Sequence, residues 1–299
     1  TRQESLSNIN CDVVESLPVH EDIKRGFGDL SGLFANYRQS LANLAAEGVQ
    51  TICYNFMPIL DWTRTDLNAP VSQGGTCLRF SAAKMAAFEL HVLGRAEAEE
   101  TYTTEAIEKG TAWFAVATKA DKERLLSSIM AGLPGAVSRF DVLGLSNEIE
   151  SYSGISHVDL RSNLNRFLSE VVPTAAELDL KLCIHPDDPP RDILGLPRIV
   201  STAADIEWIL GVVDEKANGL TLCTGSLGAH PDNDLVEISG KYSDRTHFAH
   251  LRNVRKEIDG SFEESAHLDG DVDMVNVIRE LLISNLRTGA EIPFRADHG

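Results

Sequence analysis

The sequence predicts an α/β protein built as a (β/α)8 TIM barrel with a helical insertion. Six apolar, β-branched runs alternate with segments of helical periodicity, the order that produces a parallel sheet. No glycine-rich phosphate loop follows any of these runs, which weakens the case for an open nucleotide-binding sheet. Polar residues close at least four of the runs, and the active site of a barrel lies at the carboxyl ends of its strands. We therefore predict one barrel domain over residues 1–299.

The predicted strands are short and mostly continuous in their apolar character, as expected for strands that are covered on both faces. They lie at residues 12–17, 50–56, 180–184, 220–224, 246–251 and 291–296. A (β/α)8 barrel needs two more strands than these. We expect the first two strands of the barrel to lie outside this sequence.

Helical patterns connect the strands at residues 34–48, 157–178, 201–214 and 271–284. In the second of these helices, Pro173 should produce a kink or an interruption. The long stretch between the strands ending near 56 and beginning near 180 is mostly helical in pattern, with helices expected at 81–93, 103–117 and 121–133. We interpret residues 68–155 as a helical insertion that covers the site or mediates dimerisation, and we expect a homodimer or a higher homo-oligomer.

The composition of the chain argues against several classes of protein. A net charge of −18 argues against nucleic-acid binding, which depends on Lys and Arg neutralising phosphates. No apolar run approaches the ~20 residues of a membrane-spanning helix, and no signal-peptide pattern is present, so we expect a cytoplasmic enzyme without a membrane partner. The five cysteines are odd in number and widely spaced, which indicates reduced thiols rather than a disulfide framework.

Four predicted strands end on a residue that can bind a metal ion. These residues are His185, Cys223, His250 and Asp297. The strand ends of a parallel barrel converge, and two imidazoles with one thiolate and one carboxylate would neutralise a divalent cation. The thiolate favours Mn²⁺, Fe²⁺, Co²⁺ or Zn²⁺ over Mg²⁺ and Ca²⁺. Each residue alone is weak support, since a buried cysteine is usually a small hydrophobe, but the four together predict a metal site.

Other candidate site residues lie beside these ligands. Arg252 follows His250 by two residues, a spacing that returns a side chain to the same face of a strand, so it is a candidate for binding a substrate carboxylate or for an ion pair at the rim. His298 is a candidate general acid or base, or a hydrogen-bonding neighbour of Asp297, which we also count as catalytic. Further predicted substrate contacts are His20, Asn55 and Asp187, of which Asp187 is equally suited to capping its loop.

Long stretches over nearly the whole chain carry a family likeness. They read VVESLPVHEDIK, ICYNFMPILDWTRTDL, IHPDDPPRDILGLPRIVST, ANGLTLCTGSLG, DNDLV, HLRNV, AHLDGDVDM and RADHG. The chain thereby resembles the D-mannonate dehydratases, a metal-dependent family with a xylose-isomerase-like barrel. The resemblance implies a hydro-lyase that converts D-mannonate to 2-keto-3-deoxy-D-gluconate in hexuronate breakdown. It also implies an Mn²⁺ or Fe²⁺ cofactor on the same four ligands.

The sequence departs from that family at its end. Members continue beyond Asp-His-Gly into a segment with a Gly-Tyr pair, whose tyrosine looks like a catalytic acid or base, and we expect that segment to lie outside this sequence. Two alternatives stay open. One is a metal-dependent sugar isomerase on the same barrel, which a thiolate ligand makes less favourable. The other is a non-catalytic relative that binds a metal or a sugar acid.

Overall fold

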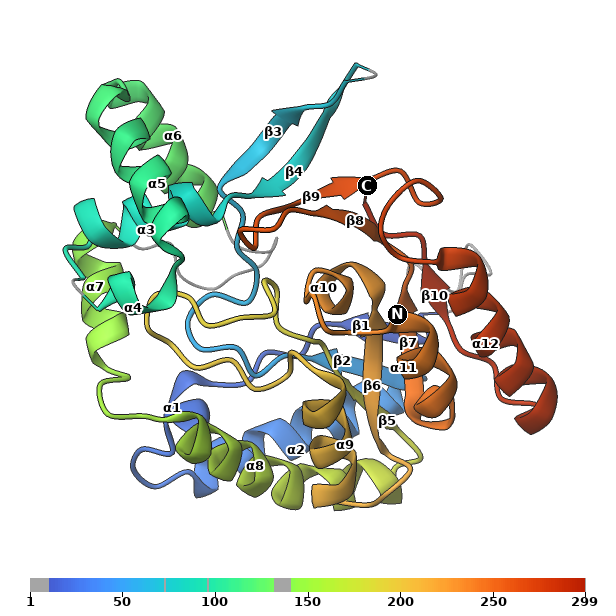
Figure 1. The fold of residues 1–299 in the computed structure, drawn as a ribbon. Coiled ribbons are helices and arrows are strands. Elements are labelled where there is room, and N and C mark those ends of the chain that lie inside the picture. The colour runs from blue at the N-terminus through green and yellow to red at the C-terminus, as the bar shows by residue number, and fades with distance from the viewer. Residues whose placement is uncertain (1–10, 73, 96, 132–140, 299) are drawn as a thin grey trace.

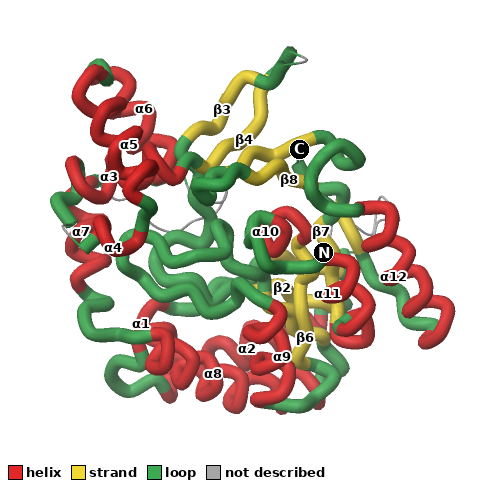
Figure 2. Tube along the Cα trace, viewed as in Figure 1, coloured by secondary structure: helices red, strands yellow, loops and turns green. Residues whose placement is uncertain are grey.

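The structure, a computed structural model, describes residues 11–72, 74–95, 97–131 and 141–298. Within these residues a parallel sheet is wrapped by helices, and a smaller antiparallel sheet and a cluster of helices adjoin it (Figures 1 and 2). None of the described helices combines the length and the apolar character needed to cross a membrane.

The parallel sheet contains six strands in the order β1-β2-β5-β6-β7-β10. Their bounds are β1 (Val13–Glu15), β2 (Thr51–Tyr54), β5 (Lys181–Ile184), β6 (Asn218–Cys223), β7 (Thr246–His250) and β10 (Phe294–Arg295). Every neighbouring pair is parallel, and each strand falls on one of the six predicted runs. The predicted parallel α/β architecture is therefore confirmed.

The parallel sheet is curled. Its two edge strands, β1 and β10, approach each other where Glu15 Oε2 lies 2.9 Å from Arg295 Nη1. The carboxyl ends of all six strands consequently surround a common space, as they do in a barrel. The eight-stranded closed barrel stays a prediction.

Helices cover the outer face of this sheet. They are α1 (Glu21–Arg25), α2 (Ser31–Ala46), α8 (His157–Glu177), α9 (Ala203–Val212), α11 (Leu235–Lys241) and α12 (Met274–Thr288), with the short α10 (Thr224–Gly228) and the 3-10 turn η2 (Ser243–Arg245) at strand ends. Outward-facing Ile52, Leu182 and Leu222 pack with Phe167 of α8 in one core. α8 continues through Pro173 without the interruption that we considered, because burial of its apolar face outweighs the local cost of about 3 kcal/mol.

The insertion is largely helical and has its own core. It contains α3 (Ala82–His91), α4 (Ala98–Thr101), α5 (Thr104–Val116), α6 (Lys119–Ile129) and α7 (Val142–Glu150), which gather at the upper left of Figure 1. Met85, Phe88 and Leu145 are fully buried in this core. The three predicted helices correspond to α3, α5 and α6, and residues 132 and 133 of the third prediction lie outside the described residues.

The antiparallel sheet was not predicted. Its strands are β3 (Asp66–Pro70), β4 (Thr76–Phe80), β8 (Asn253–Lys256) and β9 (Phe262–Ser265), in the order β3-β4-β9-β8. The strands are short and rich in polar residues, so they lack the apolar signal of the parallel strands. The sheet consists of two hairpins, β3-β4 and β8-β9, that lie far apart in the sequence. They join through β4 and β9, where Phe80 stands opposite Phe262 in the register and stacks on it with ring centroids 5.5 Å apart. The stretch 68–155 is therefore not entirely helical.

Candidate metal centre

The pleat of the parallel strands turns the strand-end residues toward the inside of the curl. Val13, Cys53, Cys183 and Phe248 form a small apolar cluster separate from the outer core. Successive side chains of a strand alternate between its faces, so the residue two positions further along shares the face of each of these four. Those residues are Glu15, Asn55, His185 and His250. Thr221 lies on the same face, with its Oγ1 3.2 Å from Cys53 Sγ, and it is followed two positions later by Cys223.

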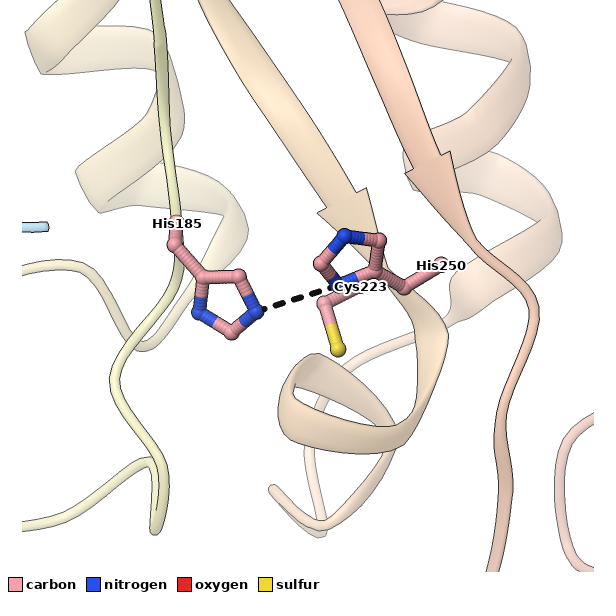
Figure 3. Close-up of side chains that lie close together, drawn as sticks. All are labelled: His185, Cys223 and His250. Atoms are coloured by element: carbon pink, nitrogen blue, oxygen red, sulfur yellow. Dashed lines mark hydrogen bonds between the residues drawn. The ribbon is translucent and has the colours of Figure 1, made fainter. Parts of the chain in front are cut away.

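Three of the predicted ligands converge. One donor atom of His185, one of Cys223 and one of His250 lie within 4.8 Å of one another (Figure 3). His185 Nε2 stands 3.3 Å from His250 Nδ1. Two metal–nitrogen bonds of about 2.1 Å that meet at about 105° would place their nitrogens about 3.3 Å apart. The spacing of the two rings therefore fits two ligands of one ion.

The second ring nitrogen of each histidine is turned toward an acceptor. His185 Nδ1 lies 2.7 Å from the Pro186 carbonyl oxygen and donates to it, which leaves the lone pair on Nε2. His250 Nε2 lies 3.2 Å from Glu15 Oε2, although it is not aligned for a hydrogen bond and has no other partner among the described residues. Histidines that bind metals present their second nitrogen to a carbonyl or a carboxylate in this way. The donor set fits a divalent cation of borderline softness.

The surroundings of Cys223 favour its thiolate form. Burial by itself raises the pKa of the thiol, but Arg252 and His185 outweigh it and hold the pKa of Cys223 well below its ordinary value. Ser226 Oγ also lies 3.1 Å from the sulfur and can donate to it. Cys223 is 0% exposed, so the negative charge is not stabilised by bulk water and needs these neighbours.

The negative charge of Cys223 in turn raises the pKa of both histidines. Burial lowers the pKa of His185, but the charge and hydrogen bond of Cys223 outweigh burial and raise the pKa to about 9. The pKa of His250 is raised to about 10 against the same effect of burial, by Cys223 and Glu15. Without a cation, these shifts favour extra protons on the imidazole nitrogens. A metal ion must displace these protons to bind.

Asp297, the fourth predicted ligand, lies outside the group of three donors. Its carboxylate is 3.2 Å from Arg295 Nη2 and 3.6 Å from Arg252 Nη1. Its backbone has a φ of 59°, in the left-handed region that few residues other than glycine adopt. The role of Asp297 as a ligand stays a prediction.

Glu15 is a carboxylate beside the centre that our sequence analysis missed. It closes β1 and lies within 3.2 Å of His250 and 2.9 Å of Arg295. The sequence carries no strand-end signal for Glu15, because the predicted strand covered residues 12–17 and placed Glu15 inside it. In the structure β1 ends at Glu15, so the strand-end argument includes this residue only with the observed bounds.

Arg252 lies in an ion pair rather than free in the site. It is buried, and its Nη2 donates to Asp188 Oδ2 at 2.5 Å and to Ser226 Oγ at 3.1 Å. Its Nε has no hydrogen-bond partner among the described residues. Gly225 allows this position, because a Cβ there would collide with Arg252 Nε. The ion pair is the alternative that the sequence left open, and the contact with substrate stays a prediction.

A buried network of charges adjoins the centre. Arg64 donates to both oxygens of Asp188, at 2.6 and 3.0 Å, and to Glu264 Oε1 at 3.1 Å. Arg252 completes the network through Asp188. Burial raises the pKa of Asp188, but the two guanidinium groups hold the pKa well below its usual range. Arg64 and Glu264 were not predicted, since nothing in their local sequence marks them as close to His185.

His298 lies at the edge of this network. Its Nδ1 is 2.5 Å from Glu264 Oε2, and its Nε2 is 3.5 Å from Arg252 Nη1. Its side chain is 43% exposed, so a substrate can reach the ring while the network holds it. The catalytic role of His298 stays a prediction.

The other predicted substrate contacts have partners within the fold. His20 caps α1, because its Nδ1 accepts a hydrogen bond from the backbone of Asp22 at 3.1 Å. Asn55 donates to Asp61 Oδ2 at 3.2 Å. Asp187 is buried and accepts hydrogen bonds from backbone and side-chain groups of residues 200 and 201, at 2.6 and 2.9 Å. These contacts shape the loops around the centre, and the roles in substrate binding stay predictions.

Comparisons with known proteins by sequence and by structure match the same family. A sequence model of the family described as D-mannonate dehydratase (UxuA) matches residues 2–299. The mannonate dehydratase of Chromohalobacter salexigens is 48% identical over 298 residues, which cover 98% of this chain and 76% of that protein. The mannonate dehydratase of a Marinomonas species is 47% identical over 293 residues, covering 96% and 75%. The crystal structure of mannonate dehydratase from Streptococcus suis serotype 2 is similar with a TM-score of 0.75 and 32% identity, over 100% of this chain and 71% of that one.

Proposed function

Because this chain belongs to the D-mannonate dehydratase family, we infer that it is a hydro-lyase that removes water from D-mannonate. The structural observation that carries this inference is the convergence of His185, Cys223 and His250 at the carboxyl ends of three neighbouring parallel strands. A sugar acid and an activating cation would meet at this end of the curled sheet. The product would be 2-keto-3-deoxy-D-gluconate, formed in hexuronate breakdown.

We propose that His185, Cys223, His250 and Asp297 hold a divalent metal ion, Mn²⁺ or Fe²⁺. The support is the donor chemistry, in which two imidazole nitrogens and a thiolate lie within 4.8 Å of one another. When bound, the cation would stabilise the negative charge that develops next to the substrate carboxylate in the transition state, an effect worth several kcal/mol. The buried thiolate and the nearby carboxylate would balance the charge of the ion.

The reaction requires two proton transfers. The proton on C2 is removed, and the C3 hydroxyl leaves with a proton as water. The resulting enol, with a double bond between C2 and C3, tautomerises to the 2-keto-3-deoxy acid. Each proton-transfer group typically contributes about 10²- to 10⁴-fold in rate. We propose His298 as one of them, because its ring is both reachable and held by Glu264.

Arg252 is the best supported of the proposed substrate contacts. Its Nη1 lies 3.5 Å from Nε2 of His298, whose side chain is 43% exposed, and a guanidinium beside a reachable ring is a suitable partner for a substrate carboxylate. His20, Asn55 and Asp187 remain proposed contacts for substrate hydroxyls. The support for them is their place in the loops that follow β1, β2 and β5.

The test is incubation of the protein with Mn²⁺ and D-mannonate. A dehydratase yields a 2-keto-3-deoxy acid that is lighter than the substrate by one water molecule, as seen by mass spectrometry. A sugar isomerase would yield a product of unchanged mass, and that result would contradict the proposal. A parallel reaction with a chelator in place of Mn²⁺ is expected to give no product.

A further inference from the structure

Glu264 is a buried carboxylate with two separate partners. It lies on β9 of the antiparallel sheet, it is 2% exposed, and its Oε1 accepts a hydrogen bond from Arg64 Nη2 at 3.1 Å. Its other oxygen, Oε2, lies 2.5 Å from His298 Nδ1. The adjacent Glu263 points to the other face of the strand, where it pairs with Arg79 at 2.7 Å. The strand therefore directs Glu264 alone toward His298.

Arg64 fixes the position of Glu264 through Oε1, the carboxylate oxygen that does not contact His298. Arg64 is 0% exposed, and Asp188 holds its guanidinium with two hydrogen bonds of 2.6 and 3.0 Å. A buried carboxylate without a partner would cost several kcal/mol, so Glu264 stays against this guanidinium. The position of the second oxygen, Oε2, is therefore fixed as well. A charge-assisted hydrogen bond from His298 to that oxygen restrains a side chain that is otherwise 43% exposed.

The same contact determines which ring nitrogen carries the proton. An ionised carboxylate can only accept, so the hydrogen bond requires a proton on Nδ1 of His298 and leaves the lone pair of the neutral ring on Nε2. The contact on the other side agrees with this tautomer, because Arg252 Nη1, which can only donate, lies 3.5 Å from Nε2. Arg252 is also the guanidinium whose charge lowers the pKa of Cys223, so it connects His298 with the candidate metal centre.

We propose that Glu264 is a positioning residue, which fixes the ring and the tautomer of His298 so that Nε2 is available for proton transfer with the substrate. The proposal rests on the proposed function, since it depends on a proton-transfer role for His298. It gives the antiparallel sheet a functional role, because β9 of that sheet places Glu264 beside His298. A buried carboxylate that orients a histidine is a general device of acid–base catalysis.

The experiment compares Glu264→Gln with the matched control Glu263→Gln on the same strand. We expect Glu264→Gln to lower kcat by at least about 10-fold while KM and metal content stay within about 2-fold of the unchanged protein. Glu263→Gln should leave kcat and KM unchanged. His298→Asn should retain the metal and lose turnover. If His298→Asn is inactive and Glu264→Gln keeps the original kcat, the positioning role is overturned.

A second measurement does not depend on activity or on the stability of a variant. In the ¹⁵N NMR spectrum of the unsubstituted protein loaded with diamagnetic Zn²⁺, His298 should show the Nδ1–H tautomer. A spectrum with the proton on Nε2 would contradict the proposal even if Glu264→Gln fails to fold. If the protein forms no 2-keto-3-deoxy acid but His298 has the expected tautomer, the proposed function fails and the orientation by Glu264 stands.

Discussion

Cys223 shows how strongly the chemistry of one residue depends on its neighbours. An isolated buried cysteine behaves as a small hydrophobe with an inert thiol. Here Arg252 and His185 lower the pKa of the thiol well below its ordinary value, in spite of burial. Cys183, which is also 0% exposed and lies on the adjacent strand, is not part of the donor group. The two cysteines therefore form a matched pair for testing the centre.

Substitution of Cys223 by Ser should lower the affinity for Mn²⁺ by at least about 10-fold, because the site loses a thiolate donor. Competition with a chromophoric chelator measures this affinity. Cys183→Ser should leave it unchanged, since that side chain lies in the apolar cluster with Phe248. Equal affinities for Cys223→Ser and the unsubstituted protein would remove Cys223 from the centre.

Metal binding should depend on pH because protons and the cation compete for the histidines. The pKa of His185 is raised to about 9 and that of His250 to about 10. These shifts favour the binding of protons near neutral pH, and the affinity for Mn²⁺ should rise as the pH increases from 6 to 9. The slope should be up to about tenfold per pH unit for each proton displaced.

Titration calorimetry at several pH values, in two buffers of different ionisation enthalpy, measures both the affinity and the protons released. In Cys223→Ser the histidines lose the thiolate that raises their pKa values, so the pH dependence should move to lower pH. An affinity that is constant between pH 6 and 9 would contradict this explanation.

At the scale of elements, the charge network joins the two sheets. Arg64 follows β2 by a loop, Asp188 lies in the loop after β5, and Glu264 lies on β9. The hydrogen bonds of Arg64 connect all three, at distances between 2.6 and 3.1 Å. The guanidinium also stacks on Trp62 and Phe262, with its carbon 4.8 and 4.9 Å from the ring centroids. The network therefore holds the antiparallel sheet against the open end of the parallel one.

Replacement of Arg64 by Met should lower the free energy of unfolding by about 3–5 kcal/mol, because two buried carboxylates lose three hydrogen bonds and one of the two guanidinium groups that compensate their charge. Urea denaturation followed by circular dichroism measures this change. Arg79→Met is the control, because Arg79 forms ion pairs on the same sheet with a partly exposed side chain, and its loss should cost about 1 kcal/mol or less. Similar losses in the two variants would show that burial of the network has no special effect.

At the scale of the whole molecule, the candidate metal centre is formed by residues from strands that lie far apart in the chain. Its donors come from β5, β6 and β7, and Glu15 of β1 adjoins them from the opposite edge of the curled sheet. These residues meet only in the folded state. A bound cation therefore stabilises the fold relative to the unfolded chain.

Added Mn²⁺ should raise the melting temperature, and above the dissociation constant the shift should grow with the logarithm of the Mn²⁺ concentration. At 100 times the dissociation constant the stabilisation is about 2.7 kcal/mol. Differential scanning calorimetry with and without a chelator measures the shift. Cys223→Ser at the same Mn²⁺ concentration should show a smaller shift. If the chelator leaves the melting temperature of the unsubstituted protein unchanged, the cation does not bind the folded state in preference to the unfolded one.

The strands of the two sheets differ in how clearly the sequence marks them. The six parallel strands were predicted because each is a continuous apolar run, which is a local signal. The antiparallel strands escaped prediction because they are short and polar, and because the pairing of β4 with β9 joins two hairpins that lie far apart in the chain. α8 was expected to be disturbed by Pro173, but burial of its apolar face keeps it continuous.

The sequence by itself determined the alternation of strands and helices, the types of donor at the strand ends and the family of the protein. These properties follow from periodicity and residue type, which are local. The tertiary structure decided the ionisation of Cys223, the approach of Glu15 to His250 and the contact of Glu264 with His298. Each of these depends on distances between side chains that are well separated in the sequence, and electrostatic energies change steeply with such distances.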